Sequence, residues 1–234
     1  METSLRIPTP WPGAPVYLRE STTSTMDDAL ALARAGCPTG TTVAAGFQER
    51  GRGRGQESRW LSGAWESLLA TVVIGRADAA FPLTQLALRA GLAVALAIQD
   101  ACGLETRIKW PNDLLSSGRK LAGILCESRG DALLVGVGVN CLQRSFPAEI
   151  ADRACSLAMA AGGDTAPLAL LPLVLARLKE CLADPGWREK VLQRLAFLGT
   201  AVRDGGAEGI VRGLDEDGAL LLEDADGRTV RRDR

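Results

Sequence analysis

The feature that most constrains this chain is a 22-residue stretch, 82–103, which reads "PLTQLALRAGLAVALAIQDACG" and carries only two charged side chains. A helix that is apolar on nearly every face is stable only when other elements cover it. The charges of Arg89 and Asp100 interrupt the stretch, so no unbroken apolar run reaches the roughly 18 residues of a membrane span. We therefore expect one long helix in the core, rather than in a dimer interface, and no contact with a membrane. A monomer and a homodimer both remain open.

The composition is that of a globular protein with one domain of ordinary size and a small appendage. The 234 residues are 47% hydrophobic and 24% charged, and the formal net charge is −1. A near-neutral chain has little bulk attraction for nucleic acid. The six cysteines form no CxxC pair, and the N-terminus lacks the basic and apolar regions of an export signal. We expect reduced thiols in a cytoplasmic protein.

Histidine is absent, which excludes a histidine base, nucleophile partner or metal ligand. Lysine is also rare, with four lysines against 23 arginines. Where arginine supplies almost all positive charge, a lysine indicates a need for a compact ammonium group. Chance retention explains the lysines equally well until their surroundings are considered.

Hydrophobic periodicity predicts an α+β fold with a mixed or largely antiparallel sheet backed by helices. The expected strands are 14–20, 41–47, 66–75, 106–110, 120–128 and 131–140, the last two forming a hairpin. The expected helices are 24–36 and 82–103, with two or three more between about 147 and 198. Turns that read "DGG", "DEDG" and "DADG" separate short strands near the C-terminus. The predicted domains are a main domain, 1–199, and a small β domain, 200–234.

A loop within residues 46–60, "GFQERGRGRGQESRW", alternates arginine and glycine between two predicted strands. Glycine lets a backbone lie close to a ligand, and the planar guanidinium groups of Arg52 and Arg54 suit phosphate or carboxylate. The loop is not a Walker A motif, and taken alone it fits an RNA-contacting tract as well as an anion-binding loop. Its place inside a folded domain, before Trp60 and Trp65, favours a loop that closes over a ligand.

A second segment, "RIKWPNDLLSSGRKLAGILCE" (107–127), carries Lys109 and Lys120 on the two sides of one turn. Pro111 ends the predicted strand, and "ND" follows where the sheet edge meets solvent. A plain hairpin with a polar tip explains the turn, but it does not explain a lysine on each side. The later "GVGVN" (136–140) ends a strand with two glycines that a planar ring could approach closely, which is a weak signal by itself.

Taken together, these motifs resemble the biotin protein ligases, also called biotin–[acetyl-CoA carboxylase] ligases. The motifs run in the order "STMDDA", "Q-x-x-GRGR…W", "KWPNDLL…GRKLAGIL", "GVGVN" and a terminal "GIVRGLDEDGALLLED", over residues 15 to 225. The "KWPND…RKLAGIL" block is the most specific. The resemblance implies a catalytic domain related to lipoate ligases and a small SH3-like C-terminal domain. Only some 15 to 20 residues precede the first predicted strand, so we expect the monofunctional class without a DNA-binding domain.

The resemblance also implies roles for particular residues. Catalytic roles fall to Lys120, Arg52 and Arg54. The implied biotin contacts are Ser24, Thr25, Met26, Gln48, Arg52, Gly53, Arg54, Lys120 and Gly123. The implied contacts to ATP and its Mg²⁺ are Lys109, Trp110, Asn112, Asp113 and Asn140, with Mg²⁺ near Asp113.

Three features depart from the family pattern. Met26 stands where the family carries asparagine. The arginine–glycine loop is one residue longer before Trp60, which affects the equivalence of Arg59. The chain ends at "TVRRDR" without the family's usual last strand, so we expect a shortened C-terminal module.

The implied reaction joins biotin to ATP as biotinyl-5′-adenylate and then transfers biotin to a lysine of a biotin carboxyl carrier protein, of acetyl-CoA carboxylase or another biotin-dependent carboxylase. Such a reaction brings anions together, so it needs positive charge more than a histidine base. One alternative is a lipoate or octanoate ligase on the same fold. The other is a non-enzymatic RNA-binding protein, which the near-zero net charge and the few aromatic residues disfavour.

Overall fold

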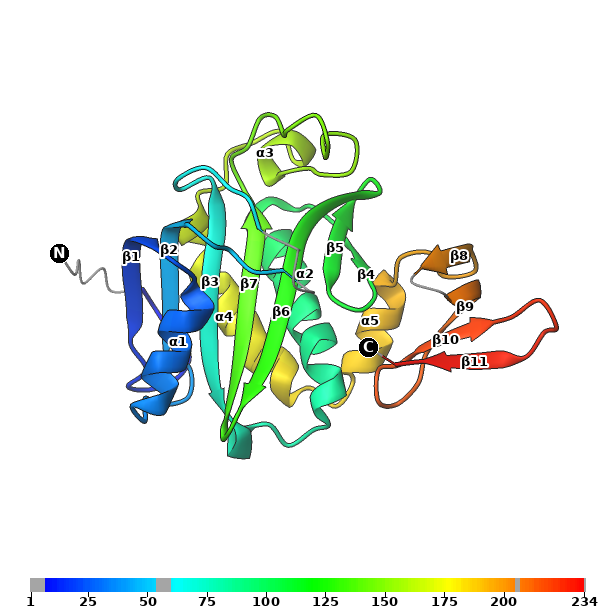
Figure 1. Ribbon diagram of the computed structural model, residues 1–234, viewed down its shortest axis with the longest axis horizontal. Coiled ribbons are helices and arrows are strands. Elements are labelled where there is room, and N and C mark those ends of the chain that lie inside the picture. Colours follow the sequence, from blue (N-terminus) through cyan, green and yellow to red (C-terminus); the bar gives the residue numbers. More distant parts are fainter. Residues whose placement is uncertain (1–6, 54–59, 205–206, 234) are drawn as a thin grey trace.

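The computed structural model describes residues 7–53, 60–204 and 207–233, and these form two β-sheets with helices around the larger one (Figure 1). The larger sheet has seven strands in the order β1-β2-β3-β7-β6-β5-β4. β1 and β2 are parallel, and every other neighbouring pair in this sheet is antiparallel. The expected mixed sheet is confirmed. Its strands are β1 (Val16–Thr22), β2 (Thr42–Gln48), β3 (Ser67–Gly75), β4 (Arg107–Lys109), β5 (Asp113–Ser116), β6 (Arg119–Arg129) and β7 (Ala132–Asn140).

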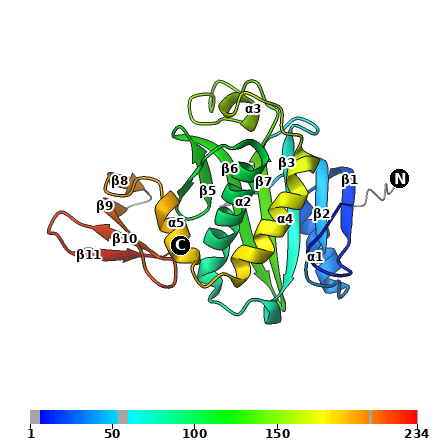
Figure 2. The same ribbon diagram turned by 180° about the vertical axis from the view of Figure 1, so that it is seen from behind.

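The two faces of the sheet are covered differently. Helix α1 (Thr25–Arg34) connects the parallel strands β1 and β2 and packs on one face, against β2, β3 and β7. Helices α2 (Leu86–Cys102) and α4 (Pro167–Ala183) pack against each other and against the opposite face (Figures 1 and 2). Helix α1 covers only part of the sheet face on which it packs. The rest of that sheet face is open beside the N-terminus of α1. The remaining helices are α3 (Leu157–Ala160), α5 (Trp187–Arg194) and two short 3₁₀ turns, Arg76–Asp78 and Leu83–Gln85.

Helix α2 is the core helix that its composition predicts. Twelve of its residues are buried, and it ends at Gly103, whose φ of 70° is the left-handed conformation that glycine adopts readily. The segment Leu83–Cys102 is long and apolar enough to cross a membrane by length and composition, yet 72% of its apolar window is buried inside the protein. Burial of that extent is what the core helix of a globular domain requires.

The central strand β7 shows how the sequence makes the two faces different. Successive side chains of a strand point to opposite faces. Val135, Val137 and Val139 belong to the core beneath α2 and α4, while Gly136 and Gly138 alternate with them and face the open side. The "VGVGV" pattern thus gives one tightly packed face and one face without side chains from these two positions.

The C-terminal residues form a separate antiparallel sheet of four strands in the order β11-β10-β9-β8. It lies beside α5, β4 and β5 (Figure 1). A small β module is what the "DEDG" and "DADG" turns predict. Its strands are β8 (Ala201–Asp204), β9 (Ala207–Leu214), β10 (Leu220–Glu223) and β11 (Thr229–Arg232).

One prediction of local structure was wrong. The sequence suggested that Asn112 and Asp113 project from a turn at the sheet edge, but Asp113 begins strand β5 and pairs with Lys109 on one side and Gly123 on the other. The peptide bond between Trp110 and Pro111 is cis, and this compact turn returns the chain to the sheet directly. The two lysines consequently lie on strands that both neighbour β5.

Arg89 joins the helices behind the sheet although it lies in an apolar helix. It is 6% exposed, and its guanidinium group is flanked by the rings of Phe81 and Trp187, 4.5 and 5.1 Å away. Burial lowers the pKa of Arg89, and the nearby carboxylate of Asp184 opposes that shift. The group donates to the terminal carbonyl oxygens of α4, those of Cys181, Leu182 and Asp184, at 2.7–3.3 Å.

We predict that Arg89→Met lowers the free energy of unfolding by about 2–4 kcal/mol, because it leaves buried carbonyl oxygens without donors. Arg177→Met is the matched control on the adjacent helix α4. Arg177 pairs with Asp100 near the surface at 2.7 Å, and loss of such a pair costs about 1 kcal/mol or less. Urea denaturation of both variants measures the difference, and equal losses would contradict the account.

Candidate functional site

The open face of the sheet holds a cavity of about 280 Å³ beside the N-terminus of α1. Its walls come from the start of α1, the end of β2, the middle of β3 and β7, the first half of β6, residues 52, 53 and 60, and the segment from β4 to β5. The cavity therefore gathers side chains that are more than 100 positions apart in the sequence. Of the fourteen residues to which the resemblance gave a catalytic or binding role, twelve line it: Ser24, Thr25, Met26, Gln48, Arg52, Gly53, Lys109, Trp110, Asn112, Asp113, Lys120 and Gly123.

Glycines form the floor of the cavity, and an indole ring lies on them. Gly123 on β6 and Gly138 on β7 are neighbours in the sheet. A β-carbon on Gly138 would lie 2.9 Å from the ring of Trp60, and one on Gly123 would lie 3.1 Å from it. The ring that lies against the "GVGVN" strand in this structure is the protein's own Trp60, and the approach of a ligand ring to this strand stays a prediction. Its indole Nε1 is buried and donates to no described residue.

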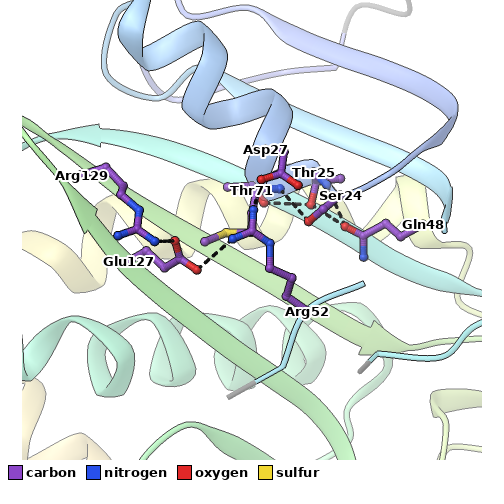
Figure 3. A network of polar contacts seen from close by, with 9 residues as sticks. Ser24, Thr25, Asp27, Gln48, Arg52, Thr71, Glu127 and Arg129 are labelled. Carbon is purple, nitrogen blue, oxygen red and sulfur yellow. Dashed lines mark hydrogen bonds and ion pairs between the residues drawn. The ribbon is translucent and has the colours of Figure 1, made fainter. Parts of the chain in front are cut away.

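The end of the cavity next to α1 is polar. Ser24 is the N-cap of α1 and accepts a hydrogen bond from the backbone N–H of Met26 at 3.3 Å. The backbone N–H and the hydroxyl of Thr25 both lie against Gln48 Oε1, at 2.8 and 3.0 Å, and the hydroxyl also meets that of Thr71 at 2.8 Å (Figure 3). A backbone N–H can only donate, so the amide oxygen of Gln48 faces α1, and its Nε2 lies towards Gly51, 3.1 Å from the position that a β-carbon there would occupy.

Thr71 is a site residue that the sequence reasoning missed. It is fully buried on β3, lines the cavity, and is bonded to a residue that the motif did identify. The available signal was a hydroxyl in the middle of the apolar strand "ESLLATVVIG", where a polar group needs a partner.

Met26 closes the same end of the cavity with an apolar group. It is 4% exposed, and its sulfur lies 2.9 Å from the position that a β-carbon on Gly136 would occupy. The absence of a side chain on Gly136 makes room for the thioether. An apolar side chain at position 26 therefore fills this buried space without leaving a polar group unpaired.

Arg52 lies at the rim of the cavity, with its charge already engaged. Its guanidinium group pairs with Asp27 on α1 and donates to Glu127 Oε1 on β6 at 3.3 Å (Figure 3). Arg129 binds the other oxygen of Glu127 at 2.8 Å. Arg52 is therefore brought to the site, but its charge is balanced by the carboxylates of Asp27 and Glu127. Arg54 lies outside the described residues, as does Arg59.

The opposite end of the cavity is charged. Lys120 Nζ lies 2.7 Å from Asp113 Oδ1, an oxygen that is buried and accepts no hydrogen bond of good geometry from the described residues. Lys109 and Trp110 stand on the neighbouring strand end and line the same space. The amide nitrogen of Asn112 instead donates to the carbonyl oxygen of Ile124 at 2.8 Å, which ties this segment to β6.

Asn140 lies in a neighbouring cavity rather than in the main one. That cavity shares Trp60, Lys109, Asp113 and Lys120 with the main site. The side-chain nitrogen of Asn140 donates to the carbonyl oxygen of Cys155 at 2.9 Å. The two cavities therefore meet at the lysine–aspartate pair, and together they offer an extended site with one polar end and one charged end.

Comparison with known proteins gives two family matches that together span most of the chain. Residues 18–143 match the model of the Biotin/lipoate A/B protein ligase family. Residues 199–233 match the Biotin protein ligase C terminal domain.

Similar sequences and structures agree with those matches. The Biotin--[acetyl-CoA-carboxylase] ligase of Paracoccus denitrificans is 37% identical, over 89% of this chain and 94% of that protein. The Bifunctional ligase/repressor BirA of Bacillus subtilis is 34% identical, over 87% of this chain and 68% of that protein. A structure of the biotin protein ligase of Aquifex aeolicus in complex with biotin and ATP superposes with a TM-score of 0.81 at 30% identity, covering 92% of this chain and 94% of that one.

We predict that Gly138→Ala lowers the free energy of unfolding by about 1–3 kcal/mol, because the added methyl overlaps the indole of Trp60. Gly163→Ala, where a β-carbon meets open space, should change it by about 0.5 kcal/mol or less. Repeating Gly138→Ala in a Trp60→Ala background should remove the effect. A loss that persists without Trp60, measured by denaturation, would show that the ring does not rest on this strand.

Proposed function

The chain belongs to the Biotin/lipoate A/B protein ligase family, and we propose that it is an ATP-dependent biotin protein ligase that acts on a lysine of a biotin carboxyl carrier protein. The observation that carries the proposal is the single cavity with a hydrogen-bonding end at α1 and a lysine–aspartate pair at the other end. Biotin has a polar ureido ring at one end and a carboxylate at the other, so its two ends match the two ends of the cavity.

In the first step, a carboxylate oxygen of biotin attacks the α-phosphorus of ATP. The bond from that phosphorus to the oxygen bridging to the β-phosphate breaks, and pyrophosphate leaves, which gives biotinyl-5′-adenylate. Both reactants are anions, so the protein contributes mainly by holding them together and by neutralising charge. The absence of histidine is compatible with this step because no base is needed to ionise a carboxylic acid near neutral pH.

Lys120 is the residue that we place at the junction of the two substrates. Its ammonium group lies where the main cavity and its neighbour meet, within 2.7 Å of Asp113. A compact cation there can contact both the biotin carboxylate and the α-phosphate. Lys109, exposed on the adjacent strand end, adds positive charge on the nucleotide side.

Asp113 is the residue that we expect to hold Mg²⁺ brought in with ATP. The described residues contain no cluster of three or more acidic, cysteine or histidine ligands, and one carboxylate with substrate phosphates is a normal magnesium arrangement. Asp113 Oδ1 is buried, accepts no well-formed hydrogen bond and lies 2.7 Å from the Lys120 ammonium, so this carboxylate would be shared between that cation and Mg²⁺. When bound, Mg²⁺ supplies positive charge beside the phosphate oxygens.

In the second step, the amine of an acceptor lysine attacks the carbonyl carbon of the adenylate. The carbon–oxygen bond to AMP breaks, AMP leaves, the nitrogen loses a proton and an amide forms. The acceptor is proposed by analogy with relatives from Paracoccus denitrificans and Mycobacterium tuberculosis, which are named as ligases for acetyl-CoA carboxylase.

A lipoate or octanoate ligase is the second candidate, because the family includes lipoate ligases. The polar end of the cavity weighs against it. Ser24, Thr25, Thr71 and Gln48 would face a dithiolane ring or an alkyl chain there. Neither group hydrogen-bonds well, so any donor or acceptor capacity that these side chains have beyond their mutual hydrogen bonds would stay unpaired against such a ligand, at a cost of about 1–3 kcal/mol for each unpaired group.

We predict that Lys120→Ala reduces biotin-dependent pyrophosphate release by roughly 10²–10³-fold, because one positive charge is lost where negative charge accumulates. Lys179→Ala is the control, since Lys179 is exposed and donates to the carbonyl oxygen of Pro10 far from the cavity. Release should require biotin. Pyrophosphate release that requires lipoate instead of biotin would show that lipoate is the substrate. No pyrophosphate release from a folded protein with either acid would overturn the enzymatic proposal.

A further inference from the structure

The C-terminal sheet contains the same turn twice, "DEDG" at 215–218 and "DADG" at 224–227. In the first, Asp215 Oδ1 accepts hydrogen bonds from the backbone N–H groups two and four residues later, at 2.9 and 2.8 Å. In the second, Asp224 Oδ1 does the same at 3.0 and 2.8 Å. Gly218 and Gly227 end the turns with φ of 85° and 75°. The two turns are therefore matched in sequence and in local structure.

The surroundings of the two turns differ. Three side chains of the main domain donate to carbonyl oxygens in or next to the first turn. A β-carbon on Gly218 would lie 2.9 Å from Leu88 of helix α2, whereas one on Gly227 would meet nothing within 4 Å. The three bonds are Gln85 Nε2 to Glu216 at 3.0 Å, Trp110 Nε1 to Gly218 at 3.0 Å, and Arg188 Nη2 to Leu214 at 2.6 Å.

Trp110 differs from the other two donors because it also lines the main cavity. Trp110 directly follows Lys109, is joined to Pro111 by the cis peptide bond, and precedes Asp113 by three residues. Its ring also lines a cavity of about 370 Å³ between the two sheets, together with residues of β8, β9 and β10. A single side chain thus contacts the charged end of the site and the docked turn of the C-terminal module.

We propose that Trp110 is a positioning residue that couples the docking of the 215–218 turn to nucleotide binding. Gln85 and Arg188 hold the turn against the main domain, and the carbonyl oxygen of Gly218 then fixes the indole. The fixed indole sets the backbone of 109–113, and with it the ammonium of Lys109 and the carboxylate of Asp113. The inference rests on the proposed function, since it concerns the nucleotide end of that same site.

The coupling is directional. The polar end of the cavity is built on α1, β2 and β3, and none of the three docking bonds involves those elements. Disturbing the turn should therefore weaken nucleotide binding and leave the affinity for biotin unchanged. A purely structural role would instead alter both affinities together, or neither.

The test measures two dissociation constants by calorimetry on the full chain, one for a non-hydrolysable ATP analogue with Mg²⁺ and one for biotin alone. Trp110→Phe keeps a ring and removes the N–H donor, so we expect nucleotide affinity to fall roughly three- to tenfold with biotin affinity unchanged. Gly218→Ala, at a residue that does not itself line the main cavity, should have the same selective effect. The double variant should lose little more than either single one, because both break the same link.

Gly227→Ala is the matched control, since it imposes the same backbone strain at the undocked turn. It should leave both affinities at the wild-type values. Nucleotide affinity within twofold of wild type in Trp110→Phe and Gly218→Ala would overturn the inference, as would an equal loss of biotin affinity. A wild-type chain that binds the nucleotide but not biotin would instead overturn the proposed function, and one that binds neither would overturn both.

Discussion

The structure depends on one constraint, that a single sheet must be closely packed on one face and only partly covered on the other. On β7 the valines pack under α2 and α4, and Gly136 and Gly138 between them leave space on the opposite face. Side chains of a strand alternate strictly between the two faces, so the packed valine face and the open glycine face arise together. A slip in register by one residue would expose valine to the cavity and place glycine in the core. The apolar helix and the glycine-lined cavity are therefore two consequences of the same pattern.

Some of the positively charged side chains stabilise the fold, and others line the cavity. Arg89 binds carbonyl oxygens in the core, and Arg52 is held by Asp27 and Glu127. These are tasks for a planar group with several donors. The lysines divide evenly: Lys109 and Lys120 line the cavity, whereas the other two are exposed and bound to a backbone oxygen and to Asp184. The rarity of lysine thus indicated the functional site at two of the four lysines and indicated nothing about function at the other two.

Much of the fold could be predicted from the sequence, because periodicity is a local property of a strand or helix. The helix at 82–103, the hairpin of β6 and β7, and the C-terminal β module all follow from local patterns. Strand β5 was missed because four residues after a proline look like a turn. The pairing of Arg52 with Glu127 and the contact of Thr71 with Thr25 join distant segments, and no single-sequence pattern specifies such contacts.

The central claim is that one cavity selects an acid with a hydrogen-bonding head group and activates its carboxylate with ATP. A direct measurement is competition in one vessel. The protein would be given ATP, Mg²⁺ and equal concentrations of biotin, lipoate and octanoate, without an acceptor protein, and the acyl-adenylates would be identified by mass spectrometry. The account predicts biotinyl-adenylate in large excess. Lipoyl- or octanoyl-adenylate in comparable or greater amount would contradict it.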